Sequence, residues 1–419
     1  MGWLKFPKYS NYFSITACLL IMIFGYIPFV EVQNILSGHV VALLVVGAAF
    51  SRLMVKHQVH EIIATNALAY ISPKNLSSLS VTLMLISAFL SMWISNTSAV
   101  VMLIPVVLAI SSKIECSAEN MLLAIAYGAT MGGMLTPIGT PANLVAIDYA
   151  ARFFDLKIGF AQWFLGVAPF VLTFMAFFAA YLWFSKSETI NFKQAKANIT
   201  QHQMTIIRAL STCVLLWATK TLPFGGWEGM LVWVTNGGLP SGLSRIYSEE
   251  AIGLATLVFC MFQFCPDKKQ LWALEDITKI SYSSIIMVIA SLFFAEAVSQ
   301  SGAVELIADH LKTLAHMSNT TWLLLVSSMV SMVTELCSNT AVTALSITLI
   351  DLIQSMTGMS VISCIFIITL SANSAFMLPT ATPPNAMIIA TEKISIAKTS
   401  QVGFCLSLLS ILLLYFIYL

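Results

Sequence analysis

Two apolar stretches, residues 77–111 and 321–356, constrain the fold of this 419-residue chain most strongly. Each is about 35 residues long, whereas one helix crosses a bilayer with roughly 20 residues. Each is also interrupted near its middle by the tripeptide Ser-Asn-Thr, in ISNTSAVVML at 94–103 and in CSNTAVTAL at 337–345. The pattern therefore predicts a re-entrant hairpin in each stretch, made of two half-length helices that meet at a polar tip.

The composition places the chain in a membrane. Hydrophobic residues make up 58% of the sequence and charged residues only 9%, against roughly 25% charged residues in a soluble domain. The net charge of +1, without a basic tract, excludes an electrostatic nucleic-acid binder. The apolar run at 12–30 is interpreted as a retained first helix, because it can span and lacks a small-residue cleavage site. Further spanning helices are predicted near 39–55, 121–138, 163–185, 206–221, 249–265, 281–299, 361–378 and 399–418.

The chain also repeats itself at a nearly constant spacing. Asn96 and Asn339 are 243 positions apart, and TPIGTPAN at 136–143 matches LPTATPPN at 378–385 at an offset of 242. HEIIA at 60–64 matches VELIA at 304–308 at an offset of 244. Three near-equal offsets in one order indicate two copies of one unit.

The positive charges indicate that the two copies are inverted. If the N-terminus is cytoplasmic and both hairpins return to the face they entered, fifteen of the 20 Lys and Arg residues lie inside, as the positive-inside rule requires. The two hairpins then enter from opposite faces of the membrane. Many secondary transporters use such an inverted repeat to hold a substrate at the midplane. The five Lys and Arg residues predicted on the outer face are Arg152, Lys157, Lys220, Arg245 and Lys312.

Each tip carries groups suited to both an anion and a cation. Its hydroxyls and carboxamide, followed by the unpaired N–H groups of a helix N-terminus, form a cradle for an oxyanion. Its oxygens, with carbonyls freed where a helix breaks, can hold sodium. The motifs TPIGTPAN and LPTATPPN predict such breaks, since their prolines remove backbone donors and lipid would not tolerate the freed carbonyls.

These motifs resemble a known family. SMWISNTS and TELCSNTA, each followed some 40 residues later by GTPAN or ATPPN, are similar to the duplicated motifs of the divalent anion:sodium symporter family, the solute carrier 13 type. The similarity covers about residue 39 to the C-terminus and includes LWALEDITKI at 271–280. It implies an all-α polytopic membrane protein with an inverted repeat, two re-entrant helical hairpins and two discontinuous helices. Such proteins are elevator-type transporters of dicarboxylates, tricarboxylates or sulfate, usually homodimers.

The resemblance also implies a set of ligands. One sodium ion would be held by Ser91, Ser95, Asn96 and the backbone of Gly139, and a second by Thr334, Asn339 and the backbones of Cys337 and Ala381. The anion would contact Ser95, Asn96, Thr97, Ser338, Asn339, Thr340, Thr382 and Pro383.

The family pattern further implies a division into scaffold and transport parts. The chain departs from that pattern at Ala142, where the family usually has proline, in SLFFAEAV, which lacks a glycine cluster, and in having fewer helices before the first hairpin. The expected parts are scaffold helices and a first arm at 1–75, a first hairpin plus broken helix at 76–155, scaffold helices with a cytoplasmic linker (186–203) and second arm at 156–317, a second hairpin plus broken helix at 318–396, and a last scaffold helix at 397–419.

The leading hypothesis is sodium-coupled symport of a small divalent anion, a C4-dicarboxylate first, across the plasma (inner) membrane into the cytoplasm. Neither tip region contains Lys or Arg, so co-bound sodium would supply the counter-charge of a buried dianion. No cofactor besides co-transported sodium is expected. An enzyme is disfavoured, because the sequence has no nucleophile–base pair, zinc signature or phosphate loop.

Alternatives remain open at this point. A sodium-independent anion exchanger of the same family is one, and a cation:proton antiporter or metalloid pump using Glu335 is another. Glu296 is interpreted as interfacial. A third Ser-Asn-Thr at 318–320 lacks an ATPPN partner and is interpreted as a helix cap, and the segment 222–248 as an external loop. The sequence does not choose among C4-dicarboxylate, citrate and sulfate.

Overall fold

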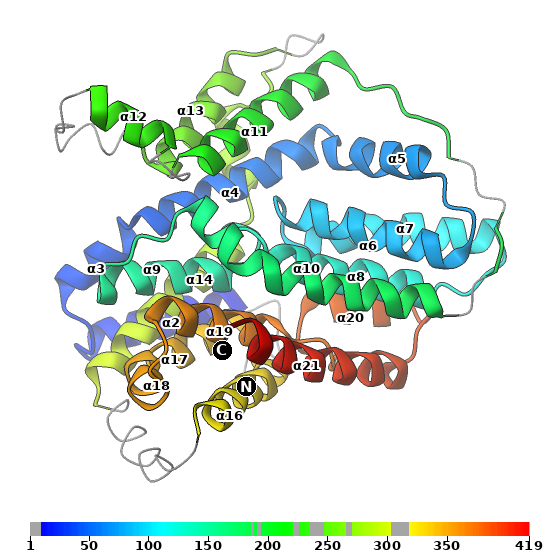
Figure 1. Cartoon of the computed structure of the whole chain (residues 1–419). Helices are drawn as coiled ribbons and strands as arrows, with labels where there is room; N and C mark the ends of the chain where they lie inside the picture. Colours follow the sequence, from blue (N-terminus) through cyan, green and yellow to red (C-terminus); the bar gives the residue numbers. More distant parts are fainter. Residues whose placement is uncertain are drawn as a thin grey trace.

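The computed structural model describes residues 10–185, 188–190, 194–220, 226–234, 247–264, 270–302 and 318–418 (Figure 1). Within these ranges the chain forms helices joined by short connections, and its β contacts are two isolated bridges, Asn75–Thr189 and Phe264–Gln270. The expected all-α fold class is confirmed. The first half contains α2 (Ser10–Ile23), α3 (Phe29–Leu36), α4 (His39–Lys56), α5 (Val59–Ile71), α6 (Leu76–Ser91), α7 (Asn96–Lys113), α8 (Glu119–Met134), α9 (Pro141–Phe154) and α10 (Phe160–Phe184).

The second half repeats this order. At offsets of 242 or 243 residues between their first residues, α4 corresponds to α14, α6 to α16, α8 to α19 and α9 to α20, and α10 corresponds to α21 at an offset of 236. VELIA, the third match of the sequence repeat, lies outside the described residues. Two helices, α11 (Gln201–Thr219) and α12 (Gly226–Val234), stand between the copies. The second copy contains α13 (Glu249–Met261), the 3₁₀ helix η2 (Leu274–Lys279), α14 (Tyr282–Gln300), α16 (Asn319–Leu336), α17 (Asn339–Ile347), α18 (Ile350–Thr357), α19 (Val361–Asn373), α20 (Pro383–Ala390) and α21 (Ile396–Tyr418).

Both Ser-Asn-Thr stretches fold as re-entrant hairpins. The two ends of the second hairpin are joined directly, since Asn319 Nδ2 donates to the Thr357 carbonyl at 2.8 Å. The first hairpin also returns to its starting side. Ser77, at the start of α6, donates to the Ser185 carbonyl, and Asn120, at the start of α8, donates to the Ser185 hydroxyl at 2.9 Å. The two hairpins lie on opposite sides of the molecule in Figure 1, α6–α7 on the right and α17–α18 on the left.

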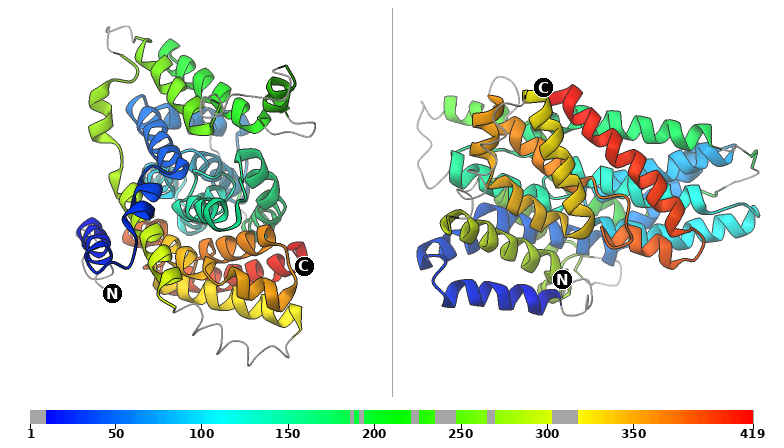
Figure 2. Two further views of the ribbon diagram at one scale, coloured as in Figure 1. Left: turned by 90° about the vertical axis from the view of Figure 1, so that its left-hand side faces the viewer. Right: turned by 90° about the horizontal axis from the view of Figure 1, so that it is seen from below.

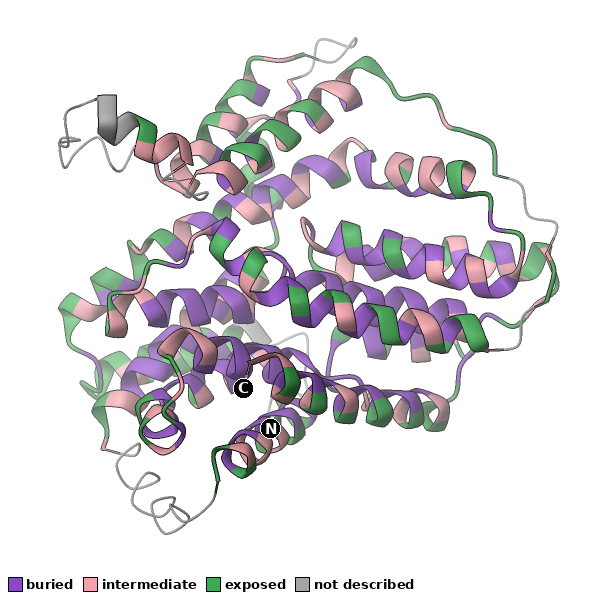
Figure 3. Cartoon of the chain, viewed as in Figure 1, coloured by how far each residue is buried: buried purple, intermediate pink, exposed green. Residues whose placement is uncertain are grey.

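The breaks in the two discontinuous helices follow from their prolines. Pro141 and Pro383 each occupy the first turn of a new helix, where a missing N–H costs nothing, and the segments 135–140 and 374–382 before them are irregular. The two broken helices cross between the hairpins. α17 of the second hairpin packs against α9, and α7 of the first hairpin packs against α20. Burial is concentrated in α8, α9 and α19, so this crossing is the core (Figure 3).

The outer helices are also exchanged between the copies. α2 packs on α14, and its repeat partner α13 packs on α4 (Figure 2). α10 and α21 pack on each other. α10 also packs on α6, the first helix of the first hairpin, and α21 on α16, the first helix of the second hairpin. The outward faces of α10 and α21 carry exposed apolar side chains such as Leu165, Leu172, Phe404 and Phe416. An apolar exterior around a core that holds buried Ser, Thr and Asn is the arrangement of a membrane protein.

Two segments differ from the sequence expectation. The run at 12–30 does not form one helix, because Gly25 has a φ of +69° and Pro28 follows it, so α2 ends at Ile23 and α3 begins at Phe29. The expected loop at 222–248 contains helix α12, in which GWEGMLVWV has no proline to stop it. In the described chain five helices are long and apolar enough to cross a membrane, or six with the α17–α18 pair, which is bent by 59°.

Candidate functional site

The tip of the first hairpin is held by hydrogen bonds among its own polar residues. Ser95 is the N-cap of α7, and its Oγ accepts from the Ser98 backbone N–H at 3.2 Å. Ser91, fully buried at the end of α6, donates from Oγ to Asn96 Oδ1 at 2.5 Å. The hydroxyl and carboxamide oxygens expected on one sodium ion are therefore adjacent. No described residue accepts from Asn96 Nδ2, so this donor is free toward a ligand.

Two glycines make room for the Asn96 oxygen. A Cβ added to Gly133 would lie 2.5 Å from Asn96 Oδ1 and 3.2 Å from the Gly139 carbonyl oxygen. A Cβ on Gly139 would in turn overlap the Gly133 backbone. The structure thus brings together Ser91, Asn96 and the carbonyl of Gly139, as the family resemblance implied. Sequence reasoning missed Gly133, although the pair Gly132-Gly133 before a proline-rich break was a signal of close backbone approach.

The second tip has matching geometry. Thr334, fully buried at the end of α16, lies with its Oγ1 2.9 Å from Asn339 Oδ1 and 2.6 Å from the Ala372 carbonyl oxygen. Ser338 is the N-cap of α17 but does not cap it with its side chain, and its Oγ faces Met287 Sδ. The first N–H groups of α17 are consequently free of a side-chain cap. Free N–H groups at a helix start are able to bind an anion, and here they lie beside Asn339, the first residue of α17.

The remaining expected anion contacts occupy helix starts around the tips. Thr97 and Thr340 follow the two Asn residues in the first turns of α7 and α17. Thr382 is the N-cap of α20, where its Oγ1 accepts from Asn385 N at 3.4 Å, and Pro383 is the first residue of that helix. Cys337 is exposed between α16 and α17.

Several carbonyls freed at each break accept hydrogen bonds from a buried Asn side chain. Asn143 donates from Nδ2 to the carbonyls of Gly133, Met134 and Thr136, and Asn385 makes the same kind of contact with those of Ala375 and Leu378. No described residue donates a hydrogen bond to the carbonyl oxygens of Gly139 and Ala381. Gly139 and Ala381 are two of the three backbone ligands, with Cys337, that the resemblance assigned to sodium, and a buried carbonyl without a donor can serve as a cation ligand.

The two breaks are tied together by a buried amide. Asn373, the last residue of α19, donates from Nδ2 to Asn143 Oδ1 at 3.0 Å and accepts from Thr140 Oγ1 at 3.3 Å. All three residues are less than 10% exposed. Sequence reasoning missed Asn373, although an Asn inside the apolar run 361–378 was a signal of a buried polar contact.

Glu335 serves the second break as a structural acceptor. Its two carboxylate oxygens accept four hydrogen bonds, at 2.8 to 3.1 Å, from the backbone N–H groups of Phe376, Met377 and Leu378. The first copy makes the corresponding tie with reversed polarity, since Thr136 Oγ1 donates to the Met92 carbonyl at 2.7 Å. Both oxygens of Glu335 are therefore committed to the backbone, which argues against a proton relay at this residue.

Charged side chains lie away from the tips. Arg152, in the last turn of α9, pairs with Asp148 at 2.7 Å and with Glu296 of α14 at 2.9 Å. Glu296 is thus buried and ion-paired rather than interfacial, because α9 and α14 pack together and the guanidinium reaches across. Among the described ion pairs and hydrogen bonds, none joins a Lys or Arg side chain to an expected sodium or anion ligand.

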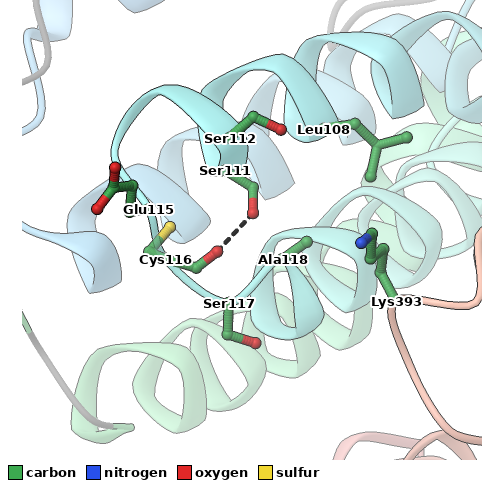
Figure 4. A pocket seen from close by; sticks show the side chains of 8 residues that line it. All are labelled: Leu108, Ser111, Ser112, Glu115, Cys116, Ser117, Ala118 and Lys393. Atoms are coloured by element: carbon green, nitrogen blue, oxygen red, sulfur yellow. Dashed lines mark hydrogen bonds between the residues drawn. The ribbon is translucent and has the colours of Figure 1, made fainter.

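Two surface clefts lie away from the tips. The cleft in Figure 4 has a volume of about 510 Å³ and sits at the turn between α7 and α8, with the Lys393 amino group at its edge. Ser111 and Asn96 are fifteen residues apart on α7, so this cleft is roughly 20 Å from the first tip. The other cleft is on α3. The lining residues are Leu108, Ser111, Ser112, Glu115, Cys116, Ser117, Ala118 and Lys393 for the first and Gln33, Asn34, Leu36 and Ser37 for the second.

An inverted repeat whose two hairpin tips meet two crossed broken helices in the core defines a secondary transporter, not an enzyme. The chain belongs to the citrate transporter family (CitMHS), whose model matches residues 11–354 and 250–419, and the resemblance to the divalent anion:sodium symporters is confirmed.

Known proteins of similar sequence and structure are also transporters by name. The sodium-dependent dicarboxylate transporter SdcS of Staphylococcus saprophyticus is 28% identical over 351 residues, which are 79% of this chain and 66% of that protein. The protein of the same name in Staphylococcus aureus is 25% identical over 417 residues, 92% of this chain and 78% of the relative. The crystal structure of the Alcanivorax borkumensis YdaH transporter, described as having an unusual topology, shares the fold with a TM-score of 0.54 at 13% identity, over 98% of this chain and 97% of that one.

Proposed function

We propose that this transporter couples the uptake of a small divalent anion, a C4-dicarboxylate first, to the symport of sodium into the cytoplasm. The observation that carries the proposal is the pair of oxygen clusters at the tips. The first joins the Ser91 hydroxyl and the Asn96 carboxamide oxygen near the Gly139 carbonyl. The second joins the Thr334 hydroxyl, the Asn339 carboxamide oxygen and the Ala372 carbonyl. Among the described ion pairs and hydrogen bonds, no Lys or Arg side chain contacts either cluster. The names of the staphylococcal relatives, sodium-dependent dicarboxylate transporters, support the same assignment.

The sodium ligands in this proposal are all oxygens, which suits a hard cation. The first ion is held by Ser91, Ser95, Asn96 and the Gly139 carbonyl. In the first cluster the contact of 2.5 Å between Ser91 Oγ and Asn96 Oδ1 gives way to a shared ion, because both oxygens turn their lone pairs to the cation. The second ion is held by Thr334, Asn339 and the carbonyls of Cys337 and Ala381.

The anion lies between the tips in this proposal. The carboxamide Nδ2 groups of Asn96 and Asn339 and the uncapped N–H groups of α17 supply donors to its oxygens. Hydroxyls of the flanking residues complete the set. The full list of proposed anion contacts is Ser95, Asn96, Thr97, Ser338, Asn339, Thr340, Thr382 and Pro383.

Electrostatics explains why sodium and anion bind together. A buried charge without a partner costs several kcal/mol. Two sodium ions neutralise a dianion, and a third would make the cycle electrogenic, worth about 2.3 kcal/mol per 100 mV of membrane potential. Sodium therefore raises the affinity for the anion directly, without a conformational signal.

The moving part of the elevator would contain both hairpins and both broken helices. α10 and α21 pack on hairpin helices α6 and α16, which favours counting these two helices with the moving part rather than with the scaffold. α4 and α14, which pack on each other and hold α13 and α2, would form the scaffold. A cytoplasmic N-terminus, a location in the plasma membrane and a homodimer complete the proposal.

Uptake into liposomes tests the coupling. Purified protein should accumulate labelled succinate when an inward sodium gradient drives the uptake, and replacing sodium by choline should abolish it. A sodium-independent exchanger would instead take up succinate in choline whenever the liposomes are preloaded with unlabelled succinate, and that result would refute the symport. Citrate and sulfate, offered as competitors, identify the preferred anion by their inhibition constants.

A further inference from the structure

The Thr334 hydroxyl, in the second proposed sodium cluster, can point its proton to either of two acceptors. These are Asn339 Oδ1 at 2.9 Å and the Ala372 carbonyl at 2.6 Å. A cation bound between Thr334 Oγ1 and Asn339 Oδ1 needs the lone pairs of both oxygens. The proton must then point to Ala372, so occupation of the second site fixes the end of α19.

The next residue along α19 carries that change to the other copy. Asn373 donates to Asn143 Oδ1 at 3.0 Å and accepts from Thr140 Oγ1 at 3.3 Å. Thr140 directly follows Gly139, whose carbonyl belongs to the first sodium cluster. The chain of contacts from one cluster to the other thus contains two peptide units, 372–373 and 139–140, and the buried side chains of Asn373 and Thr140.

The corresponding contact from the first copy to the second, from α8 to Asn385, is missing. The residue that corresponds to Asn373 at the 242-residue offset is Met131, a buried thioether without a donor. Asn385, the counterpart of Asn143, accordingly keeps a buried Oδ1 without any hydrogen-bond partner. Among the described residues, this buried amide link is therefore made from the second copy to the first and is absent in the reverse direction.

We propose that Asn373 is a positioning residue that couples the two sodium sites, so that sodium at the second tip strengthens sodium binding at the first. The inference rests on the proposed function, because it needs both tips to bind sodium. Ordering of Thr140 and Asn143 by Asn373 sets the position of the Gly139 carbonyl before the first ion arrives. By linkage the effect is reciprocal, and sodium at the first tip strengthens the second site equally.

Sodium titrations without any anion test the coupling. Thermal stabilisation of the purified full-length protein by NaCl, against choline chloride, should give a Hill coefficient near two for the wild type and near one for Asn373→Met. In the wild-type background Thr334→Ala should weaken sodium binding at the first site at least fivefold. In the Asn373→Met background the same change should leave the first site unaffected, which a merely structural role of Asn373 does not predict.

Met131→Asn is the matched control. It places an amide opposite the orphan Asn385 Oδ1, so it should raise the melting temperature and leave the Hill coefficient of the wild type unchanged or higher. If Asn373→Met does not fold, Asn373→Ser, which is too short to reach Asn143, decides the question by the same readout. An unchanged Hill coefficient in the variant that folds overturns the inference while leaving the symport intact. A wild type that sodium does not stabilise overturns both.

Discussion

Replacing Gly133 by alanine tests the first sodium site at a single atom. The new Cβ would lie 2.5 Å from Asn96 Oδ1, and ordinary contact begins at 3.4 Å, so the oxygen must retreat by about 0.9 Å. Metal ligands hold their positions to about 0.2 Å. The backbone of α8 cannot absorb the clash, because α8 is buried along its length. The helix itself tolerates the change, since alanine has a higher helix propensity than glycine.

The expected loss can be given a magnitude. Disturbing one supporting contact of a metal site typically costs 10–100-fold in affinity. Sodium at about 100 times its dissociation constant stabilises the folded protein by about 2.7 kcal/mol. After a 100-fold loss the same concentration equals the dissociation constant, and the stabilisation falls to about 0.4 kcal/mol. Gly133→Ala should therefore remove about 2.3 kcal/mol of sodium-dependent stability at the first site.

The assay is thermal unfolding in NaCl and in choline chloride, together with the sodium concentration that half-saturates succinate uptake. Gly128→Ala is the control, because its Cβ would press on the Met84 carbonyl at 2.6 Å and not on the tip. That variant should lose stability equally in both salts, by about 1–3 kcal/mol from overpacking. The reasoning is refuted if Gly133→Ala keeps the half-saturating sodium concentration of the wild type.

Three further outcomes follow from the contacts. Glu335→Gln should abolish transport, because an amide N–H₂ would face backbone N–H groups that now donate to the carboxylate, and each unsatisfied group costs about 1–3 kcal/mol. Asn96→Ala should abolish transport too. A proton antiporter would instead tolerate Asn96→Ala in a proton-flux assay. Arg152→Gln should lower the free energy of unfolding by about 3 kcal/mol, because two buried carboxylates lose their partner; denaturation that matches the wild type would contradict this. Cys337, exposed at the second tip, should react with maleimide more slowly in sodium plus succinate than in choline, and equal rates would exclude a ligand there.

The sequence alone determined the membrane class, the repeat and the position of the breaks at the two hairpin tips and in the two discontinuous helices. An apolar stretch of about 35 residues is too long for one crossing, and the clustered prolines of TPIGTPAN and LPTATPPN each interrupt a helix. These are local properties of the chain, so they can be recognised without coordinates. The third Ser-Asn-Thr was separable for the same reason, and Ser318 is indeed the N-cap of α16.

The tertiary structure decided which polar groups meet. Gly133 matters because Asn96 of another helix fills the space above it, and Asn373 matters because it reaches Asn143 at 230 residues' distance along the chain. Glu335 became a backbone acceptor rather than a relay once the 376–378 segment closed over it. Such contacts depend on how two inverted copies cross, and no periodicity or motif within one copy encodes the partner that the other copy supplies.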